Sequence, residues 1–439
     1  MSTIKQLWNN RRATAWIFIE LVIITIITWI IADPVTISVY DSNLPMGYDN
    51  DRLVILQMTS FASDVPGFDA SRDSLEVNKS DVETVMMKIR NYPGVESVTI
   101  DEGFGLPGAD SNSFDHYDIG DEAVDTVVKS VNAFVYHTGT NFFETLGMKS
   151  VEGSPTVEEL SATCTAPDKV IITSDVARLY WPGENAVGKK FLRWTDDEGN
   201  QHFTTVIGVV SGIRHQLPFR SYCATFYCGD HMFPDEPLRN FKVVARLSDP
   251  TKTDAIVDEL YDWGNRELAI GNFYLRSVQT YNAFLEDTNR MHGIPNQLNL
   301  RYILAGFFLV NLILGVVGTF WLQTRKRITE MGIRRAFGAP RGNIVGLMLG
   351  ENLLLATVAC LTGVFIYWQY ALRNGLAIGY DKNEIINVVD NWIAHFGQHF
   401  IVISAIVYAL IIICVTVGTL LPAMSVSRID IVDSLRSKE

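Results

Sequence analysis

The sequence lacks the short motifs that mark most enzymes and nucleotide-binding proteins. It has no G-x-x-x-x-G-K-[ST] loop, so we do not expect this chain to bind ATP in the P-loop manner. It also has no C-x-x-C pair, no H-E-x-x-H motif and no serine in a nucleophile-elbow pattern. His395 and His399 are four residues apart, but no third ligand accompanies them, so we expect no metal site. We predict no catalytic residue, no cofactor and no enzyme activity of the chain itself.

Cysteine is scarce, with 5 residues in a chain of 439. Cys360 and Cys414 lie in apolar runs, where cysteine behaves as a small packing residue. Cys223 and Cys228 are close enough in sequence to pair across a tight hairpin in an oxidising compartment. Such a bridge leaves Cys164 over, and an odd cysteine weakens any disulfide framework. The Cys223–Cys228 bridge is therefore a candidate and not a firm prediction.

Positive charge is in deficit, with 36 Lys and Arg against 49 Asp and Glu and a formal net charge of −13. The deficit is concentrated in residues 33–300, where 21 basic residues face 40 acidic ones. This acidity argues against nucleic-acid binding and against docking on anionic lipid by charge. It is compatible with a cationic partner, although solubility explains it equally well.

Hydrophobic residues, by contrast, gather in long runs. Each run has about 20 residues or more, enough for a helix to cross a hydrocarbon core of ~30 Å. The runs are residues 13–32, 302–322, 344–370 and 400–421. The first is longer than the apolar part of a usual secretory signal, and no clear small-x-small cleavage site precedes Asp33. We therefore predict four membrane-spanning helices, the first of them an uncleaved anchor.

A basic loop between the second and third runs sets the orientation. Arg325–Arg341 holds six Lys or Arg and a single acid, Glu330. Short loops rich in Lys and Arg stay on the cytoplasmic side, so we expect both termini inside and residues 33–300 outside. Within this loop, GIRRAFG is typical of a short helix that ends at Gly338.

The acidic segment between the first two runs predicts an α+β domain. Residues 35–40, 52–58 and 95–100 are rich in β-branched residues, as strands are, and residues 81–92 have the apolar spacing of an amphipathic helix. Residues 281–300 are expected to lead into the membrane as one continuous helix with a kink at Pro295.

The expected secondary structure of this segment changes after a Gly- and Pro-rich stretch at residues 103–113, where a pattern of short strands and turns begins. Helix and strand patterns return after Phe241. We therefore predict two lobes. Residues 36–120 and 240–280 form one α+β lobe, and residues 125–235 form an inserted β-rich lobe.

Two acidic residues interrupt the apolar runs. Glu20 and Glu351 are costly in lipid and are functional candidates by default, although a hydrogen bond to a neighbouring span is the simpler role for Glu20. Gly315 and Gly318 would permit close contact between helices. Pro422 is expected to end or redirect the last span.

The basic loop also carries the clearest likeness to a known family. It resembles the pattern E-x-G-I-R-R-A-x-G-A of the permease subunits of MacB/FtsX/LolCE-type ABC transporters. The matching residues are Glu330, Gly332, Ile333, Arg334, Arg335, Ala336, Gly338 and Ala339.

Other segments extend the likeness in the right order. NFFETLGM followed by Glu152-Gly153, VIITSDVARLYWPGENAVGKKF and TTVIGVV resemble segments of the MacB-type periplasmic core. The tail LPAMSVSRIDIVDSLR resembles P-A-x-x-A-x-x-x-x-P-x-x-A-L-R. The sequence departs from these patterns at Ser154, where Arg is usual, and at Ser427, Ile431 and Ser434 in the tail.

The resemblance implies a fold class and a domain order. The fold is a membrane protein with four transmembrane α-helices and a large α+β periplasmic domain, with porter-like and β-rich lobes, between helices one and two. The order is an interfacial helix at 1–12, a transmembrane helix at 13–32, a MacB-like core at 33–300, an FtsX-like domain at 301–425 with its coupling loop at 323–343, and a cytoplasmic tail at 426–439.

The resemblance also implies partners and a function. We expect a multi-pass protein of the bacterial inner membrane that works with a separate cytoplasmic ABC ATPase, a second permease and, in some systems, a periplasmic adaptor. The basic loop would be the ATPase-coupling element, and movements of the periplasmic domain would drive export or extraction of a peptide, a small toxic molecule or a lipoprotein. The alternative is an FtsX-like regulator of a periplasmic partner such as a cell-wall hydrolase.

Overall fold

The structure, a computed structural model of the chain, divides into two compact units. We call residues 1–40, 296–379 and 390–439 the helical unit, and residues 41–295 and 380–389 the sheet unit. The structure describes residues 11–428 apart from 104, 110–112, 122–123, 164–167, 197, 216–221, 229–235, 327–332, 335–336, 377–391 and 394.

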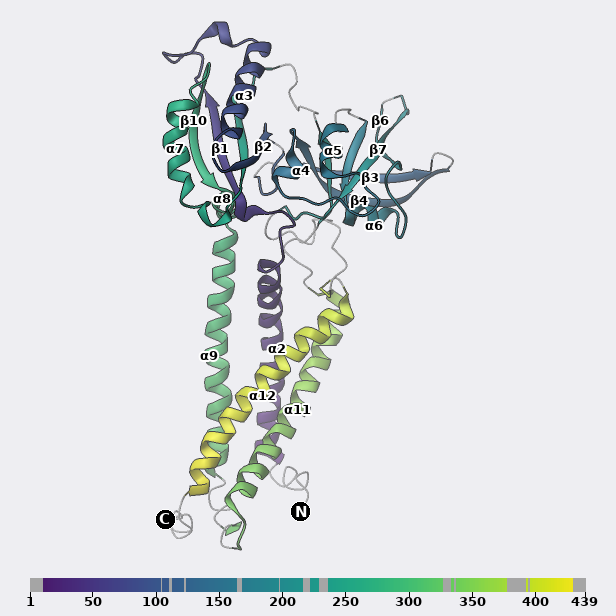
Figure 1. Cartoon of the computed structure of the whole chain (residues 1–439). Helices are drawn as coiled ribbons and strands as arrows, with labels where there is room; N and C mark the ends of the chain where they lie inside the picture. Colours follow the sequence, from purple (N-terminus) through teal and green to yellow (C-terminus); the bar gives the residue numbers. More distant parts are fainter. Residues whose placement is uncertain are drawn as a thin grey trace. The chain divides into compact units, whose positions relative to one another are not determined.

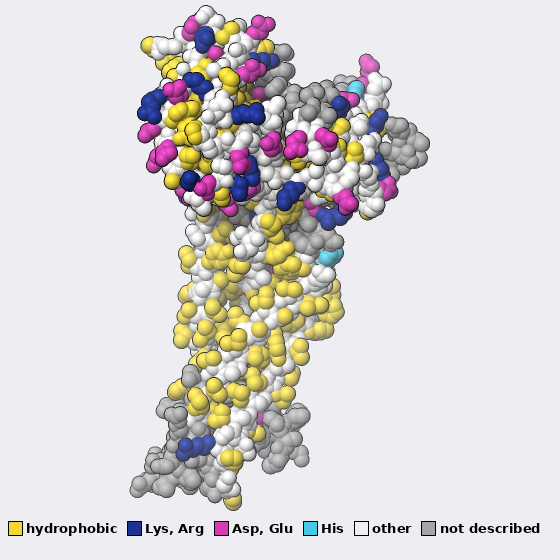
Figure 2. All heavy atoms as spheres, viewed as in Figure 1, with side chains coloured by type: hydrophobic (Ala, Val, Ile, Leu, Met, Phe, Trp, Pro, Cys, Tyr) yellow, Lys and Arg dark blue, Asp and Glu magenta, His cyan; other side chains and the backbone are white. Residues whose placement is uncertain are grey.

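Four helices of the described chain are long and apolar enough to cross a membrane, and each contains one of the predicted apolar runs. They are α2 (Arg11–Ser42), α9 (Ile294–Lys326), α11 (Arg341–Asn374) and α12 (Phe396–Arg428) (Figure 1). Their outward side chains are mostly hydrophobic, whereas charged side chains gather on the sheet unit (Figure 2). This distribution confirms the predicted fold class of a multi-pass helical protein with a mixed α/β domain after the first helix.

Close packing in the helical unit depends on two glycines that the sequence did not single out. A Cβ at Gly363 of α11 would lie 2.8 Å from Cβ of Thr25 in α2, and one at Gly418 of α12 would lie 2.9 Å from Cα of Val317 in α9. Gly315 and Gly318, the glycines predicted to permit helix contact, have nothing within 4 Å of such a Cβ. Within the described chain, these two glycines therefore make no close contact with another helix.

The structure differs from two further local predictions about the helices. Residues 35–40 are not a strand, because α2 continues through Pro34 to Ser42 and buries Ile37 and Ser38. Pro422 does not end α12, and Ala423 beyond it packs against Ile344 and Met348. Tertiary packing outweighs local propensity at both sites.

The segment 281–300 is not one helix. Helix α8 (Tyr281–Met291) ends before Gly293, whose φ of +69° breaks the helical path, and α9 begins at Ile294. Pro295 lies in the first turn of α9, where a missing N–H costs no hydrogen bond. The glycine therefore makes the break that the sequence assigned to the proline.

The sheet unit contains a four-stranded antiparallel sheet in the order β10-β1-β9-β2. Its strands are β1 (Leu53–Ser60), β2 (Val95–Asp101), β9 (Asn240–Leu247) and β10 (Phe273–Thr280). Helices α3 (Leu75–Arg90) and α7 (Ile256–Glu267) cover one face, where Leu56 of β1 packs with Val85 of α3 and Val54 packs with Leu260 of α7. Alternate residues of the same strand, such as Leu53 and Ile55, point to the other face.

The second sheet closes into a barrel in the order β3-β4-β8-β5-β7-β6. Its strands are β3 (Ser113–Asp121), β4 (Val124–Thr138), β5 (Lys169–Thr173), β6 (Lys190–Thr195), β7 (Gln201–Val210) and β8 (Ala224–Cys228). The remaining elements of the sheet unit are α4 (Phe142–Thr145), α5 (Val157–Thr163), α6 (Ser174–Tyr180) and the 3-10 turns Asn50–Arg52, Ala70–Arg72 and Pro250–Lys252. The barrel closes where Asp118 of β3 pairs with Leu192 of β6.

The boundary between the two lobes lies earlier than predicted. Strand β3 falls within the range 36–120 assigned to the first lobe, but it belongs to the barrel. Its acids Asp115, Asp118 and Asp121 hide the strand pattern in the sequence. The Gly-rich loop after β2 is the boundary, and Asp101 fixes its start by accepting hydrogen bonds from the backbone N–H groups of Gly103 (3.0 Å) and Gly105 (2.8 Å).

One buried core joins the two lobes. Leu53 and Ile55 of the sheet share it with Phe134 of β4, Phe142 of α4 and Tyr281 of α8. The second face of the sheet is therefore covered by the barrel and its helices, and the two lobes cannot separate without exposing this core to water.

His215 lies at the centre of the joint between the lobes. Its side chain is fully buried, and its Nδ1 is 2.9 Å from the hydroxyl of Tyr136 and accepts a hydrogen bond from the N–H of Gly108 at 3.3 Å. Burial lowers the pKa of His215 from 6.5 to about 3, because the charged imidazolium loses its hydration. Folding of the sheet unit therefore favours the neutral form of His215.

The glycine packing predicts opposite effects at two positions. Replacing Gly418 by Ala brings a Cβ to 2.9 Å from the backbone of Val317, and we expect a loss of about 1–3 kcal/mol in the free energy of unfolding. Gly315→Ala is the matched control, because its Cβ meets nothing and alanine favours helix by up to ~1 kcal/mol. Unfolding of both variants by dodecyl sulfate in mixed micelles checks this, and equal midpoints would contradict it.

The buried His215 predicts a loss of stability in acid. Its folded-state pKa lies below its unfolded value, so the unfolded chain binds more protons between about 6.5 and about 3. The contribution of neutral His215 to the free energy of unfolding is fully present above pH 6.5. It is lost as pH falls below that value, by on the order of 1 kcal/mol per pH unit. We expect the thermal midpoint of the His215→Gln variant to fall less than that of the wild type between about pH 7 and about pH 5. Val170→Ala is the control, because it removes buried apolar groups of the sheet unit but no titrating group, and it should lower the midpoint and keep the wild-type pH profile.

Candidate functional site

The loop between α9 and α11 is the first candidate site, and the structure describes only part of it. Glu330, Gly332, Arg335 and Ala336 lie outside the described residues. The second part of the loop, residues 333–339, is described apart from 335 and 336, and we call it the α9–α11 turn.

This turn ends as the sequence predicts. Gly338 has a φ of +89°, the left-handed conformation that glycine adopts readily. The N–H of Phe337 donates to the carbonyl of Ile333 at 3.2 Å, and the N–H of Ala339 donates to the carbonyl of Arg334 at 3.2 Å. These bonds close a short helical turn at Gly338 in the manner of a helix C-terminus.

Two apolar side chains of the turn are exposed. Phe337 is 89% exposed and Ile333 is 46% exposed, and the two are four residues apart. Side chains at this spacing lie on one face of a helix. Ile333 is one of the residues expected to couple to the ATPase. Phe337 was not predicted, although its position four residues after Ile333 was a usable signal.

The intramembrane acids have different surroundings. Glu20 of α2 is half-buried and accepts a hydrogen bond from the hydroxyl of Thr319 in α9 at 3.0 Å, which is the structural role proposed as the simpler one. Glu351 of α11 is buried, and its neighbour Asn352 donates to the hydroxyl of Thr419 in α12 at 3.1 Å. Glu20 therefore lies at a polar contact between two helices, and Glu351 is buried next in sequence to a residue that makes one.

The candidate bridge between Cys223 and Cys228 does not form, and Cys223 is a buried cysteine that forms no disulfide. Cys228 is the last residue of β8, and Cys223 immediately precedes that strand. An extended strand rises ~3.3 Å per residue, which separates the two Cα atoms by far more than the ~7 Å that a disulfide spans. Among the described residues, no group of three or more His, Cys, Asp and Glu is placed to hold a metal ion.

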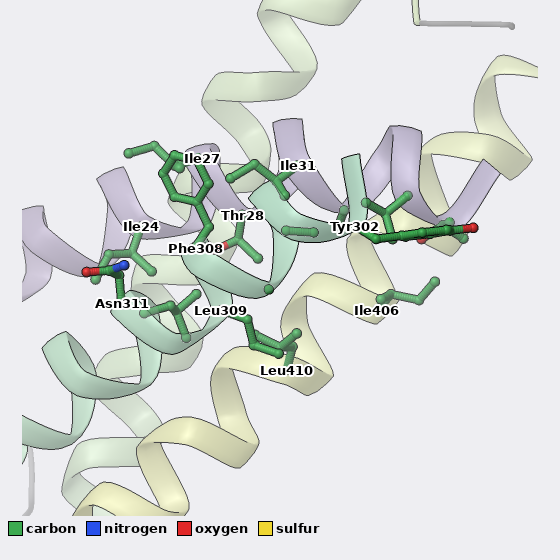
Figure 3. A pocket seen from close by; sticks show the side chains of 16 residues that line it. Ile24, Ile27, Thr28, Ile31, Tyr302, Phe308, Leu309, Asn311, Ile406 and Leu410 are labelled. Carbon is green, nitrogen blue, oxygen red and sulfur yellow. The ribbon is translucent and has the colours of Figure 1, made fainter. Parts of the chain in front are cut away.

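An apolar cavity of about 540 Å³ lies within the helical unit, between α2, α9 and α12. Figure 3 shows Ile27 and Ile31 of α2, Phe308 and Leu309 of α9, and Leu410 of α12 around it. Its few polar lining groups include Thr28, Asn311 and Tyr302. A cavity of this size and lining suits an apolar group with few hydrogen-bonding atoms.

Polar contacts join α2 to α9 on both sides of this cavity. Glu20 and Thr319 meet before it along α2, and Arg301 donates to the hydroxyl of Ser38 after it at 3.1 Å. Residues of both helices between these contacts line the cavity. The helices are thus held at two points and leave an apolar space between those points.

Parts of the chain are similar to known proteins. Residues 302–431 match the model of the FtsX-like permease C-terminal family. The chain is 24% identical over 279 residues to the macrolide export ATP-binding/permease protein MacB of Sodalis glossinidius, covering 61% of this chain and 39% of that protein. It is 24% identical over 133 residues to an uncharacterized ABC transporter permease, YknZ, of Bacillus subtilis, covering 30% of each.

A solved structure, the periplasmic region of MacB from Actinobacillus actinomycetemcomitans, aligns with 53% of this chain and 91% of its own length at 13% identity and a TM-score of 0.31. The chain spans about two fifths of the length of the Sodalis protein.

The contact between Glu20 and Thr319 predicts a measurable loss. Thr319→Val keeps the shape of the side chain but removes the donor, and hydrogen bonds between membrane helices contribute about 0.5–2 kcal/mol. Thr362→Val is the control, because among the described residues the Thr362 hydroxyl donates within its own helix, to the carbonyl of Val358. We expect faster amide hydrogen exchange along α2 and α9 in the first variant. Equal exchange in both variants would show that the contact contributes nothing.

Proposed function

We propose that this chain is an ABC permease of the MacB/FtsX type and that its role is mechanical. The match of residues 302–431 to the FtsX-like permease C-terminal family and the similarity to MacB support this proposal. An ABC ATPase, expected as a partner subunit, binds the α9–α11 turn. ATP-driven movement of the ATPase displaces the turn, and the displacement reaches the sheet unit through the helices. The cargo moves because the sheet unit moves.

The observation that carries this proposal is the exposure of Phe337 and Ile333 on the α9–α11 turn. Leaving a large apolar side chain in water forgoes about 1.5–3 kcal/mol of burial. Aromatic residues and Arg are enriched at the centres of protein interfaces, and Arg334 lies in the same turn. A partner protein that covers this turn buries both side chains and contacts the segment that joins α9 to α11.

The turn is connected to rigid elements on both sides. α9 leads into it and α11 leads out of it, and each is a single helix of more than 30 residues. α9 follows directly after α8 of the sheet unit, with only His292 and Gly293 between the two helices. A displacement at the turn therefore has a short covalent path to the sheet unit, and the shared core keeps the sheet and barrel together when it arrives.

Energetically, this is a two-state rigid-body change that a ligand favours at a distance. ATP shifts the equilibrium only as far as its affinities for the two states differ. The permease contributes its two arrangements, and the ATPase contributes the difference in affinity. The substrate need not pass through the helical unit itself.

Orientation and assembly belong to the same proposal. We place the chain in a bacterial inner membrane with both termini and the α9–α11 turn in the cytoplasm and the sheet unit outside, because the turn lies in the basic loop. A second permease, identical or related, completes the pair of ATPase sites, and an adaptor outside the membrane is a further partner.

The cargo is a periplasmic or membrane-anchored molecule: a peptide, a small toxic molecule or a lipoprotein. The apolar cavity supports a cargo with a hydrophobic part, because its lining offers few polar partners. The alternative is regulation of a partner such as a cell-wall hydrolase. It uses the same coupling step and differs in what the sheet unit contacts, so transport by the reconstituted complex separates the two roles.

The coupling role predicts the effect of removing Phe337. Phe337→Ala is expected to leave folding unchanged, because the side chain is 89% exposed and exposed substitutions usually stay within about ±0.5 kcal/mol. At an interface the same truncation costs about 2 kcal/mol or more, so we expect binding of the ATPase to weaken at least ~10-fold. Copurification of the ATPase and its turnover in lipid measure this.

The control is Phe365→Ala, which removes an exposed Phe of α11 far from the turn in sequence. Arg334→Glu adds a second test, because it reverses a charge of the turn and should likewise uncouple the ATPase. Normal binding and normal coupled turnover in both turn variants would reject the coupling role. The basic residues of the loop would then serve only to orient the chain in the membrane.

A further inference from the structure

The barrel of the sheet unit carries a pocket that the proposed coupling step does not use. It has a volume of about 400 Å³ and lies between the loop that joins α4 to α5, helix α6 with the turn after it, and strand β7. Its apolar lining comes from Val151, Ala177, Trp181, Ala186 and Val209. A pocket of this volume is large enough for a small ligand or for one side chain of a larger one.

Hydrogen bonds hold the walls of this pocket in place without a ligand. Oγ of Ser154 accepts from the N–H of Val209 at 2.8 Å, and the N–H of Val151 donates to the carbonyl of Val209 at 3.0 Å. The side-chain amide of Asn185, in the turn after α6, donates to the carbonyl of Gly153 at 3.3 Å. Because these bonds already order both loops, binding of a ligand costs little further ordering.

The charges around this pocket do not balance. Arg178 forms an ion pair with Asp175, and Glu184 forms one with Lys189. Glu152, which also lines the pocket, is exposed and makes no hydrogen bond or ion pair with any described part of the chain. Three acids thus face two bases, and the carboxylate of Glu152 is the one left without a counter-charge.

Trp181 gives the pocket an aromatic wall. The residue is half-buried, so one part of its side chain packs in the barrel core and another part faces the pocket. Nζ of Lys189 lies 5.6 Å from the centroid of the ring, which shows that this indole accepts a cation near its face. An indole also packs well against methylene groups. The pocket therefore suits an apolar stem that ends in a positive charge.

We propose that this pocket binds an apolar chain that ends in an ammonium group, as the side chain of lysine does. The ammonium pairs with Glu152, and the methylene stem lies against Trp181 and the other apolar residues of the lining. The excess of acids over bases in residues 33–300 attracts cations to this part of the chain. This recognition site goes beyond the proposed mechanical role and requires neither ATP nor the ATPase.

Three blocked tripeptides, each with two flanking glycines, test the chemistry of the ligand. The first has a central lysine. The second has norleucine, which keeps a stem without the charge, and the third has 2,4-diaminobutyrate, which keeps the charge on a stem two methylenes shorter. Binding to the full chain in phosphatidylcholine nanodiscs is measured by saturation-transfer NMR, with empty nanodiscs subtracted. We expect the lysine peptide to bind about threefold more tightly than either of the others, or better, because it alone has both contacts.

Two variants test the place of binding. Glu152→Gln removes the charge but keeps the size of an exposed side chain, so folding should be unaffected. Glu158→Gln is the matched control, because Glu158 of α5 is also exposed and does not line the pocket. We expect the first variant to weaken binding of the lysine peptide about two- to fivefold and to leave the norleucine peptide unchanged. The control should change neither.

Pentylamine, which has the stem and the charge without a peptide backbone, identifies the source of the ammonium. Tighter binding of the lysine peptide assigns the pocket to a peptide side chain, equal or tighter binding of pentylamine assigns it to a free amine, and both results support a cationic ligand. No binding of either probe, equal affinities of the lysine and norleucine peptides, or equal effects of Glu152→Gln and Glu158→Gln would overturn the proposal. Because the ATPase is absent from these measurements, their failure would leave the coupling role of the α9–α11 turn unaffected.

Discussion

The organisation of the sheet unit depends on one shared hydrophobic core. Helices cover only one face of the four-stranded sheet, and the other face is covered by residues of the barrel and of α4 and α8. Arg246 of β9 reinforces this joint by binding Asp49 at 2.6 Å and the carbonyl of Thr145 at 3.3 Å. Two lobes that share a core move as one body, and the mechanical role proposed for this chain requires such a body.

Much of this fold could be predicted from the sequence because its signals are local. The four apolar runs, the alternation of residues 52–58 and the spacing of residues 81–92 each report the environment of their own element. The failures lie where tertiary contacts decide. β-branched residues 35–40 are helical because α2 continues past Pro34, and the acid-rich β3 is a strand because the barrel pairs it on both sides.

Among the candidate sites, too, features with a local sequence signal were predictable and features that depend on tertiary contacts were not. The helix end at Gly338 was predictable, since a glycine after a short helical pattern is a local signal. The contacts between Asp33 and His399 and between Gly418 and Val317 were not, because each joins helices that are distant in the chain. In a membrane, where all spans are apolar, hydrophobic periodicity says little about which faces meet. The small and polar residues decide this, and their partners become visible only in the structure.

Helix α2 has a hydrogen bond to each of the other three membrane helices. The bonds are Glu20–Thr319 and Ser38–Arg301 to α9, Thr25–Cys360 to α11, and Asp33–His399 and Trp29–Ser404 to α12. Apolar helix surfaces exchange one hydrocarbon neighbour for another at little cost, whereas a hydrogen bond broken in lipid has no water to replace it. A displacement of α9 or α11 therefore either carries α2 with it or breaks one of these bonds. Transmission through the helical unit depends on which of the two costs less, and the α2 contacts are the residues that set this balance.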